Sequence, residues 1–394
     1  MGKKRKILIL VIGIINILGV YSQDKLVNAN NNFAFKIYKA TRPDSTNFFI
    51  SPFSLHLALA ITNEGAKTTT RQEIDKLLSI VDMDNRAIEY KDLIKKTIWS
   101  DNESGENALY LANSLWINNG FQIDKNYKQT IEDKYYSKVF DFDKNNILSA
   151  NQKLNSWVSN ETHDKIKEIS GLTPEIKLSI LNAIYFMGEW EVPFKKNKTI
   201  LKNFHSITRD ENKVDFMNEQ SIYKYYEDGD IQSLILPYKR NQFSMIVLLP
   251  QERYGISKIE EKISLDYLNK VLKSSFLKEV IISLPKFKIE TEISLKKDII
   301  KMGYGEMFSD KADFTNISTN LLRIDKFTHK TFIEIDERKT EAFAVSKVDM
   351  VMITGLAKPT PPAPKIFNAD HPFVFAIVDN RTKAIIFIGR FVKK

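Results

Sequence analysis

Of the residue types that carry out catalysis, cysteine is absent and histidine is sparse in this chain, and the spacing of the others builds none of the common catalytic motifs. There is no cysteine, and the five histidines form no HExxH pair of zinc ligands: His56, His163, His205, His329 and His371. The chain also lacks a GxSxG turn and a phosphate-binding loop, and Gly303-Tyr304-Gly305 lacks the third glycine of a dinucleotide site. Serines and carboxylates are plentiful, so a triad assembled by folding stays open as a minor alternative. The sequence predicts no metal site, no cofactor and no enzyme.

The most unusual stretch lies near the C-terminus, from Asp336 to Lys365, and its two halves differ. In the first half, small residues alternate with mostly bulky or charged ones, which is typical of a strand with one buried face; the small residues are Thr340, Ala342, Ala344, Ser346 and Val348. The second half holds Gly355 and four prolines, which cannot join a central strand. We predict an exposed loop whose first half is able to become a strand.

The rest of the chain predicts one α+β domain, because helical patterns predominate in its first half and strand patterns in its second. The segment 178–186 is almost continuously apolar, which predicts a central strand buried on both faces, with Asn182 inside it. Helices are expected at residues 25–40, 55–63, 67–78, 127–134, 150–169, 254–273 and 295–302. Strands are expected at residues 48–50, 108–117, 214–218, 223–226, 231–236, 243–249, 280–289, 327–335, 373–378 and 384–392.

Two local patterns refine these elements. Thr70 followed by Glu73 is typical of a capping box, so Thr70 is expected to cap the helix over residues 67–78. Pro285 lies inside the strand expected at residues 280–289, which predicts that this strand is bent or lies near an edge.

Composition favours a globular protein with a large core, since 43% of the 394 residues are hydrophobic and 27% are charged. The formal net charge is +9, but the basic residues 3–6 supply four of these charges. The remainder is spread along the chain without clustered stacking aromatics, so we predict no nucleic-acid partner. Without cysteine, the core alone must stabilise the fold.

The N-terminus resembles an export signal. Basic residues 3–6 precede an apolar run over residues 7–21, which is short against the roughly 20 residues of a membrane span. Val20 and Ser22 stand at positions minus three and minus one of a cleavage site before Gln23. We therefore predict a signal peptide at residues 1–22 and a secreted, extracellular protein without stable membrane insertion. A periplasmic location and an uncleaved surface anchor are the alternatives.

Seven segments, in the same order along the chain, resemble the motifs of the serpin family. The segment 47–55, for example, reads NFFISPFSL and resembles the family pattern N-x-F-I-S-P-x-S-I/L. The others are residues 63–73, 155–166, 181–190, 284–287, 329–335 and 369–377. Each motif alone is weak, but seven in order are specific. The resemblance implies an α+β fold with three β-sheets and about nine helices, and a single serpin domain over residues 23–394.

The resemblance also implies a function. Such a protein would be a suicide-substrate inhibitor of serine-type, or cysteine-type, endopeptidases, whose cleaved loop inserts into the main sheet while the enzyme is still esterified to it. Ile, Met or Leu before the cut points to elastase-, chymotrypsin- or subtilisin-like targets, and we expect a monomer. The alternative is a non-inhibitory serpin that acts as a binding or carrier protein.

The reactive-centre loop would run over residues 337–365, with the scissile bond at Ile353-Thr354. A count from the other end of the loop leaves alternatives: Met352, Gly355, Leu356 and Ala357. The residues of the loop hinge would be Glu337, Lys339, Thr340, Ala342, Ala344 and Ser346. Lys339 stands where inhibitory members usually carry glycine, and this departure argues against inhibition.

Three further sets of residues carry over by motif. A polar cluster under the middle of the main sheet, called the shutter, would consist of Ser51, Ser54, Asn182 and His329. The point of first insertion at the top of the sheet, called the breach, would contain Trp190, Lys286 and Glu337, with a Lys286–Glu337 pair at the base of the loop. A basic run could bind a polyanion, although a solvated loop is the favoured alternative: Lys195, Lys196, Lys198 and Lys202.

Overall fold

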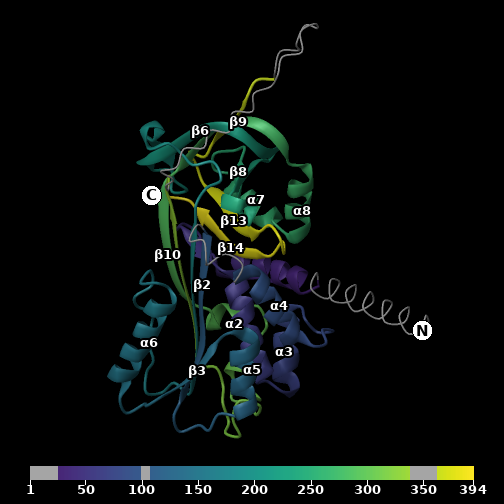
Figure 1. Cartoon of the computed structure of the whole chain (residues 1–394), viewed down its shortest axis with the longest axis vertical. Coiled ribbons are helices and arrows are strands. Elements are labelled where there is room, and N and C mark those ends of the chain that lie inside the picture. Colours follow the sequence, from purple (N-terminus) through teal and green to yellow (C-terminus); the bar gives the residue numbers. More distant parts are fainter. Residues whose placement is uncertain (1–24, 99–106, 338–361) are drawn as a thin grey trace, which may run out of the picture.

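The computed structural model describes residues 25–98, 107–337 and 362–394. The signal peptide expected at residues 1–22 and most of the expected reactive-centre loop lie outside these ranges. Within them the fold is α+β, with most helices in the first half of the chain and most strands in the second, as the sequence predicts (Figure 1).

A five-stranded sheet runs through the centre of the molecule in the order β10-β11-β4-β2-β3. Its strands are β10 (Phe287–Ser294), β11 (Lys326–Ile335), β4 (Leu178–Gly188), β2 (Asn107–Asn118) and β3 (Lys138–Phe142). The apolar strand predicted at residues 178–186 is β4, the middle strand, and all nine of these residues are buried. This burial explains the continuous apolar run, because a middle strand has neighbours on both edges and cover on both faces.

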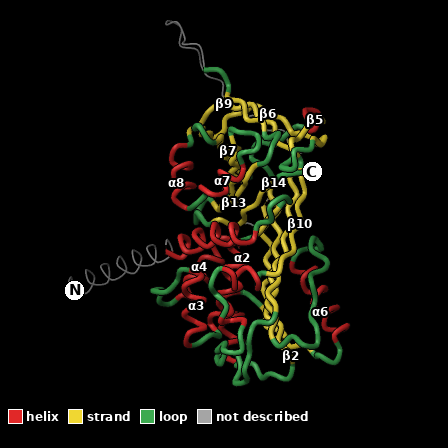
Figure 2. Tube along the Cα trace, turned by 180° about the vertical axis from the view of Figure 1, so that it is seen from behind, coloured by secondary structure: helices red, strands yellow, loops and turns green. Residues whose placement is uncertain are grey.

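Helices cover both faces of this sheet. Both views show α6 (Ile147–Glu161) on one face, with the other helices of the N-terminal half on the opposite face (Figures 1 and 2). These are residues 25–41, α2 (Pro52–Glu64), α3 (Thr68–Leu78), α4 (Arg86–Ile98) and α5 (Lys125–Tyr135). The start of α2 follows its sequence signal, since Ser51 is the N-cap and its Oγ accepts a hydrogen bond from the Ser54 N–H at 3.2 Å.

The other nine strands form one hydrogen-bonded path, β1-β14-β13-β8-β7-β6-β9-β12, with β5 attached to β6. The long strand β6 (Glu211–Glu227) divides this path into two parts, one on the β9 side and one on the β7 side. Residues 216–225 of β6 pair with β9, whereas only residues 224–227 pair with β7. With the central sheet, these two parts make the three sheets that the resemblance implies. The strands are β1 (Phe48–Ile50), β5 (Ile200–His205), β7 (Ile231–Pro237), β8 (Phe243–Pro250), β9 (Phe276–Pro285), β12 (Lys365–Asn368), β13 (Phe373–Asp379) and β14 (Ile385–Phe391).

Some predicted elements are wrong in extent. The helix expected at residues 254–273 is two helices, α7 (Ile256–Lys262) and α8 (Leu265–Ser274), because Ser264 caps a new helix and accepts a hydrogen bond from the Tyr267 N–H at 3.1 Å. The helix expected to reach residue 169 ends at Glu161, since His163 and Asp164 take positive φ values of 48° and 60°. A short helix, α9 (Lys296–Lys301), and three 3-10 turns complete the described elements: Lys196–Lys198, Lys239–Asn241 and Glu306–Phe308.

The predictions at Pro285 and Thr70 have different outcomes. Pro285 does not bend one strand; it ends β9, and Lys286 separates β9 from β10. The alternative of a nearby edge holds, because β10 is an edge strand of the central sheet. Thr70 is not the N-cap of α3, which follows Lys67; the Thr70 Oγ1 instead accepts a hydrogen bond from the Asp313 N–H at 2.9 Å. A tertiary partner has taken the hydroxyl that the local pattern assigned to capping.

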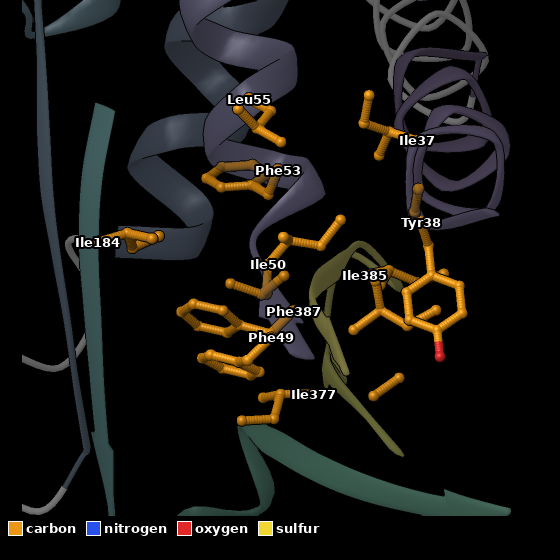
Figure 3. Close-up of a cluster of buried hydrophobic side chains, with 14 of the residues drawn as sticks. Ile37, Tyr38, Phe49, Ile50, Phe53, Leu55, Ile184, Ile377, Ile385 and Phe387 are labelled. Atoms are coloured by element: carbon orange, nitrogen blue, oxygen red, sulfur yellow. The ribbon is translucent and has the colours of Figure 1, made fainter. Parts of the chain in front are cut away.

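The core lies between the central sheet and β1, β13 and β14 (Figure 3). Phe49 of β1 stacks on Phe387 of β14 with ring centroids 4.8 Å apart, and on Phe375 of β13 at 5.8 Å. Every residue of α2 except Glu64 is buried, which explains why its sequence is apolar almost all round.

A buried ionic cluster links the first described helix to the last strand. Glu260 of α7 and Arg390 of β14 are 2% and 1% exposed, and the Arg390 Nη1 lies 3.1 Å from the Glu260 Oε1. Tyr38 donates a hydrogen bond to the same carboxylate at 2.7 Å, and the Arg42 Nε lies 3.4 Å from it. Because both charges are removed from water, each depends on the other.

Candidate functional site

The central sheet contains a parallel pair of strands, β4 and β11, that is only partly closed. Their register runs from Ser179↔Lys326 to Tyr185↔Phe332, and the pairing ends there although both strands continue. A small cavity of about 20 Å³, which has room for about one water molecule, lies between the continuing ends. Because β4 and β11 are parallel, a strand inserted between them can run antiparallel to both. A chain segment that leaves the end of β11 and turns back would run in this antiparallel direction.

The breach residues meet at the rim of this cavity. Trp190 donates a hydrogen bond from Nε1 to the Asp336 carbonyl oxygen at 3.1 Å, and its ring stacks on Tyr238 with centroids 4.5 Å apart. The Lys286 Nζ lies 2.8 Å from the Glu337 Oε2, so the expected ion pair is present where the chain leaves β11.

Glu337 is only 5% exposed, and two groups hold its carboxylate. Lys286 contacts one oxygen, and the Thr199 hydroxyl donates to the other at 2.6 Å. Burial raises the pKa of Glu337, but the hydrogen bonds from Lys286 and Thr199 outweigh it and the net pKa is lowered. The hydrogen bond to Glu337 in turn raises the pKa of Lys286. The base of the expected loop is therefore fixed by a charged contact.

The shutter residues form a polar layer inside the core. Asn182 of β4 is opposite His329 of β11 in the sheet register, and it is also opposite Asn113 of β2. The Asn182 Oδ1 bonds to the His329 Nδ1, and its Nδ2 donates to Asn113 and to the Ser54 Oγ. Ser51 closes the layer, since its N–H donates to the His329 Nε2 at 3.0 Å.

These contacts define the proton arrangement of His329. Because Nε2 accepts from a backbone N–H, the ring proton sits on Nδ1 and is donated to Asn182. Burial lowers the pKa of His329 to about 3, so the imidazole is neutral. The His329–Asn182 bond crosses directly between β4 and β11.

Sequence reasoning missed two residues of the site, Asn113 and Thr199. Asn113 stands in a mostly apolar strand, which is the same signal that singled out Asn182. Thr199 gives no local signal, because only the fold brings it to Glu337.

The remaining candidates are the rest of the loop hinge, the scissile bond and the basic run. The hinge residues after Glu337 and all residues proposed for the scissile bond lie outside the described residues. In the basic run, Lys198 pairs with Glu219 at 2.6 Å and Lys202 donates to the Ser283 hydroxyl at 2.8 Å. Two of the four lysines thus already have partners, which weakens the polyanion alternative.

Neither a metal-binding cluster nor a membrane-spanning helix is present among the described residues. No group of three or more His, Asp or Glu side chains among them could hold a metal ion. None of the helices in the described ranges is long and apolar enough to cross a membrane.

Fold and site together define a class: an α+β protein whose central sheet is open where the chain leaves it, above a buried polar layer. The family model described as Serpin (serine protease inhibitor) matches residues 28–394. The chain belongs to the serpin family. Members of this family typically target proteases and act mostly as inhibitors rather than as catalysts.

Individual proteins agree with this membership. The chain is 35% identical over 378 residues to intracellular coagulation inhibitor 1 of Tachypleus tridentatus, covering 93% of this chain and 88% of that protein. The native thermophilic serpin tengpin has a TM-score of 0.83 at 30% identity, covering 94% of each chain. Human thyroxine-binding globulin complexed with thyroxine has a TM-score of 0.83 at 26% identity, covering 94% of this chain and 99% of that chain.

Proposed function

We propose that this serpin is an exported suicide-substrate inhibitor of serine-type or cysteine-type endopeptidases. The observation that supports it is the partly open β4–β11 pair, which lies at the end where the chain leaves β11 through Glu337. A loop cut near Ile353 would fold back from Glu337 and insert between the two strands.

Insertion would break and replace specific contacts. The Lys286–Glu337 pair at the base of the loop and the His329–Asn182 bond lie on its path. The new strand would gain hydrogen bonds to two strands at once, and this gain is what distorts the attached enzyme. The small residues from Thr340 to Ser346 suit this role, because side chains on the inward face must pass over the buried layer.

The test is incubation with a panel of elastase-, chymotrypsin- and subtilisin-like proteases. A covalent complex that survives detergent is expected, and mass spectrometry of the released fragment would identify the bond among residues 352–357. Cleavage of the loop without any complex would reject inhibition, and Lys339 in the hinge would be the first residue to examine. Sequencing the N-terminus of the secreted protein would test cleavage before Gln23.

A second candidate, the carrier, is favoured by a groove of about 590 Å³ beside α8. Its lining is largely apolar, and its described lining residues include four basic side chains and no acidic one: Lys224, Lys273, Arg381 and Lys383. Such a groove suits a small amphipathic anion. Thyroxine-binding globulin, with the same fold, holds thyroxine.

The carrier is tested by titration with anilinonaphthalenesulfonate, an apolar ring system with one negative charge. Saturable binding that weakens at least tenfold in the variant Lys224→Glu/Lys273→Glu, together with no protease complex, would favour the carrier. Heating before and after loop cutting separates the two candidates further, because only an inserting loop raises the unfolding temperature.

A further inference from the structure

Three aromatic rings lie in a row across the central sheet, on the face that α6 covers. They belong to three neighbouring strands: Tyr110 of β2, Tyr185 of β4 and Phe332 of β11. Tyr110 and Tyr185 are partners in the strand register, and their rings stack with centroids 6.0 Å apart. Tyr185 and Phe332 are also register partners, and their ring centroids lie 5.8 Å apart. Both distances are typical of favourable aromatic pairs.

The second of these contacts stands where the pairing between β4 and β11 ends. Tyr185↔Phe332 is the last pair in the register, and the two strands continue beyond it without pairing. The next pair on the same face joins the small Ala183 to the charged Lys330. The Tyr185–Phe332 ring contact is therefore a large apolar contact at the border between the closed and the open part of this strand pair.

Each of the two rings is held from its own side of the border between β4 and β11. Tyr185 stacks on Tyr110 of β2, whereas Phe332 lies under Lys288 of β10, whose Nζ is 5.4 Å from the ring centroid. In the strand order β10-β11-β4-β2-β3, an opening between β11 and β4 leaves β10 with β11 and β2 with β4. Each ring would then move with its own part of the sheet, so the Tyr185–Phe332 contact is lost and the Tyr110–Tyr185 contact is kept.

The loss of this contact comes early in the opening of the sheet. An inserted strand would widen the spacing between β4 and β11 from about 4.8 Å to about 9.6 Å, which is too wide for the two rings to touch. Strands that part from their open end lose the Tyr185–Phe332 contact before they reach the His329–Asn182 bond, three residues further along each strand. Because the new strand gains its hydrogen bonds only where β4 and β11 have already parted, the ring contact adds to the barrier rather than to the final state.

We propose that the Tyr185–Phe332 ring contact sets the rate at which the central sheet opens to admit the cut loop. This inference rests on the inhibitor function proposed above and assigns two positioning residues to it. Both rings act through the strands that carry them: they keep β4 and β11 together until the loop enters. The strength of their contact thereby decides how quickly an acyl-enzyme is trapped relative to its hydrolysis.

The test measures how fast the uncut protein takes up a fluorescently labelled synthetic peptide with the sequence of residues 340–350. Phe332→Leu keeps an apolar side chain but loses the ring, and we expect the rate constant of uptake to rise roughly two- to tenfold, the factor that an aromatic pair implies. Phe332→Tyr retains a ring and should keep the wild-type rate. The matched control Tyr110→Leu removes the ring contact at 6.0 Å, which stays on one side of the opening, and should leave the rate unchanged.

The outcomes separate the ring contact from the inhibitor function. Equal uptake rates in the wild-type chain and Phe332→Leu overturn the role of the ring contact and leave inhibition standing. Equal acceleration in Phe332→Leu and Tyr110→Leu also overturns that role, because a general loosening of the sheet then explains both. A wild-type chain that takes up no peptide overturns the opening of the sheet and both proposals with it, whereas uptake without any protease complex overturns inhibition alone. If Phe332→Leu fails to fold, Tyr185→Leu gives the same comparison.

Discussion

Lowering the pH from 7.5 to 5.0 is expected to destabilise this protein through two buried histidines. His329 donates to Asn182 and accepts from the Ser51 N–H, and burial lowers its pKa to about 3. Burial also lowers the pKa of His56 to about 4, and both of its nitrogens lie 3.0 Å from partners in the core. The unfolded chain takes up these two protons near pH 6.5, before the folded chain does.

The size of the effect follows from the pKa values. Their stabilising contribution is complete above pH 6.5 and is lost as the pH falls toward the folded values. Each pH unit in this interval removes about 1.4 kcal/mol per histidine, so each loses about 2 kcal/mol by pH 5.0 and the pair loses about 4 kcal/mol. Paired carboxylates such as Glu337 contribute little to the change in stability between pH 7.5 and pH 5.0, because the ordinary pKa values of carboxyl groups lie below this range.

The assay is urea unfolding followed by tryptophan fluorescence at pH 7.5 and pH 5.0. The variant His56→Gln should lose about half of the pH dependence, whereas His163→Gln, at an exposed position, should keep all of it. A loss under 1 kcal/mol in the wild-type chain, or an equal loss in all three proteins, would show that buried neutral histidines do not govern its acid stability.

Two substitutions test the charged contacts. Glu260→Gln leaves Arg390 buried without its counter-charge and should lower the free energy of unfolding, measured in urea, by about 3–5 kcal/mol. The control Glu252→Gln removes an exposed ion pair and should lower the free energy of unfolding by under 1 kcal/mol. Equal losses in the two variants would contradict the role of burial. Lys286→Gln should cost about 1 kcal/mol, since its side chain is 34% exposed and solvent weakens the pair with Glu337. The double variant Lys286→Gln/Glu337→Gln should cost less than the sum of the single changes, and strict additivity of the measured free energies would exclude coupling.

Periodicity alone predicted much of the fold. The continuous apolar run of β4 reflects burial, which the sequence records directly, and burial in the second half of β11 alternates as its period-two pattern does. The division between α7 and α8 was missed, because a serine N-cap inside an apolar helical pattern is a weak signal. The cap at Thr70 was wrong, since a partner more than two hundred residues away decides its hydrogen bond.

The candidate site was predicted in part. Asn182 and His329 were found because polar groups in buried segments need partners and because their motifs resemble those of serpins. Their contact with Asn113 depends on strand register, which a single sequence does not encode locally. Thr199 reaches Glu337 only through the fold.

The place of β14 between β1 and β13 has a consequence for biosynthesis. The N-terminal helix and the start of α2 bond to it: Asn30 donates to the Ile385 carbonyl oxygen, Asn31 to Lys383 and Ser51 to Ile386. Until the residues of β14 have left the ribosome, these early segments lack their partner and their apolar surfaces stay open to chaperones. This part of the core therefore cannot close while the chain is shorter than β14 requires.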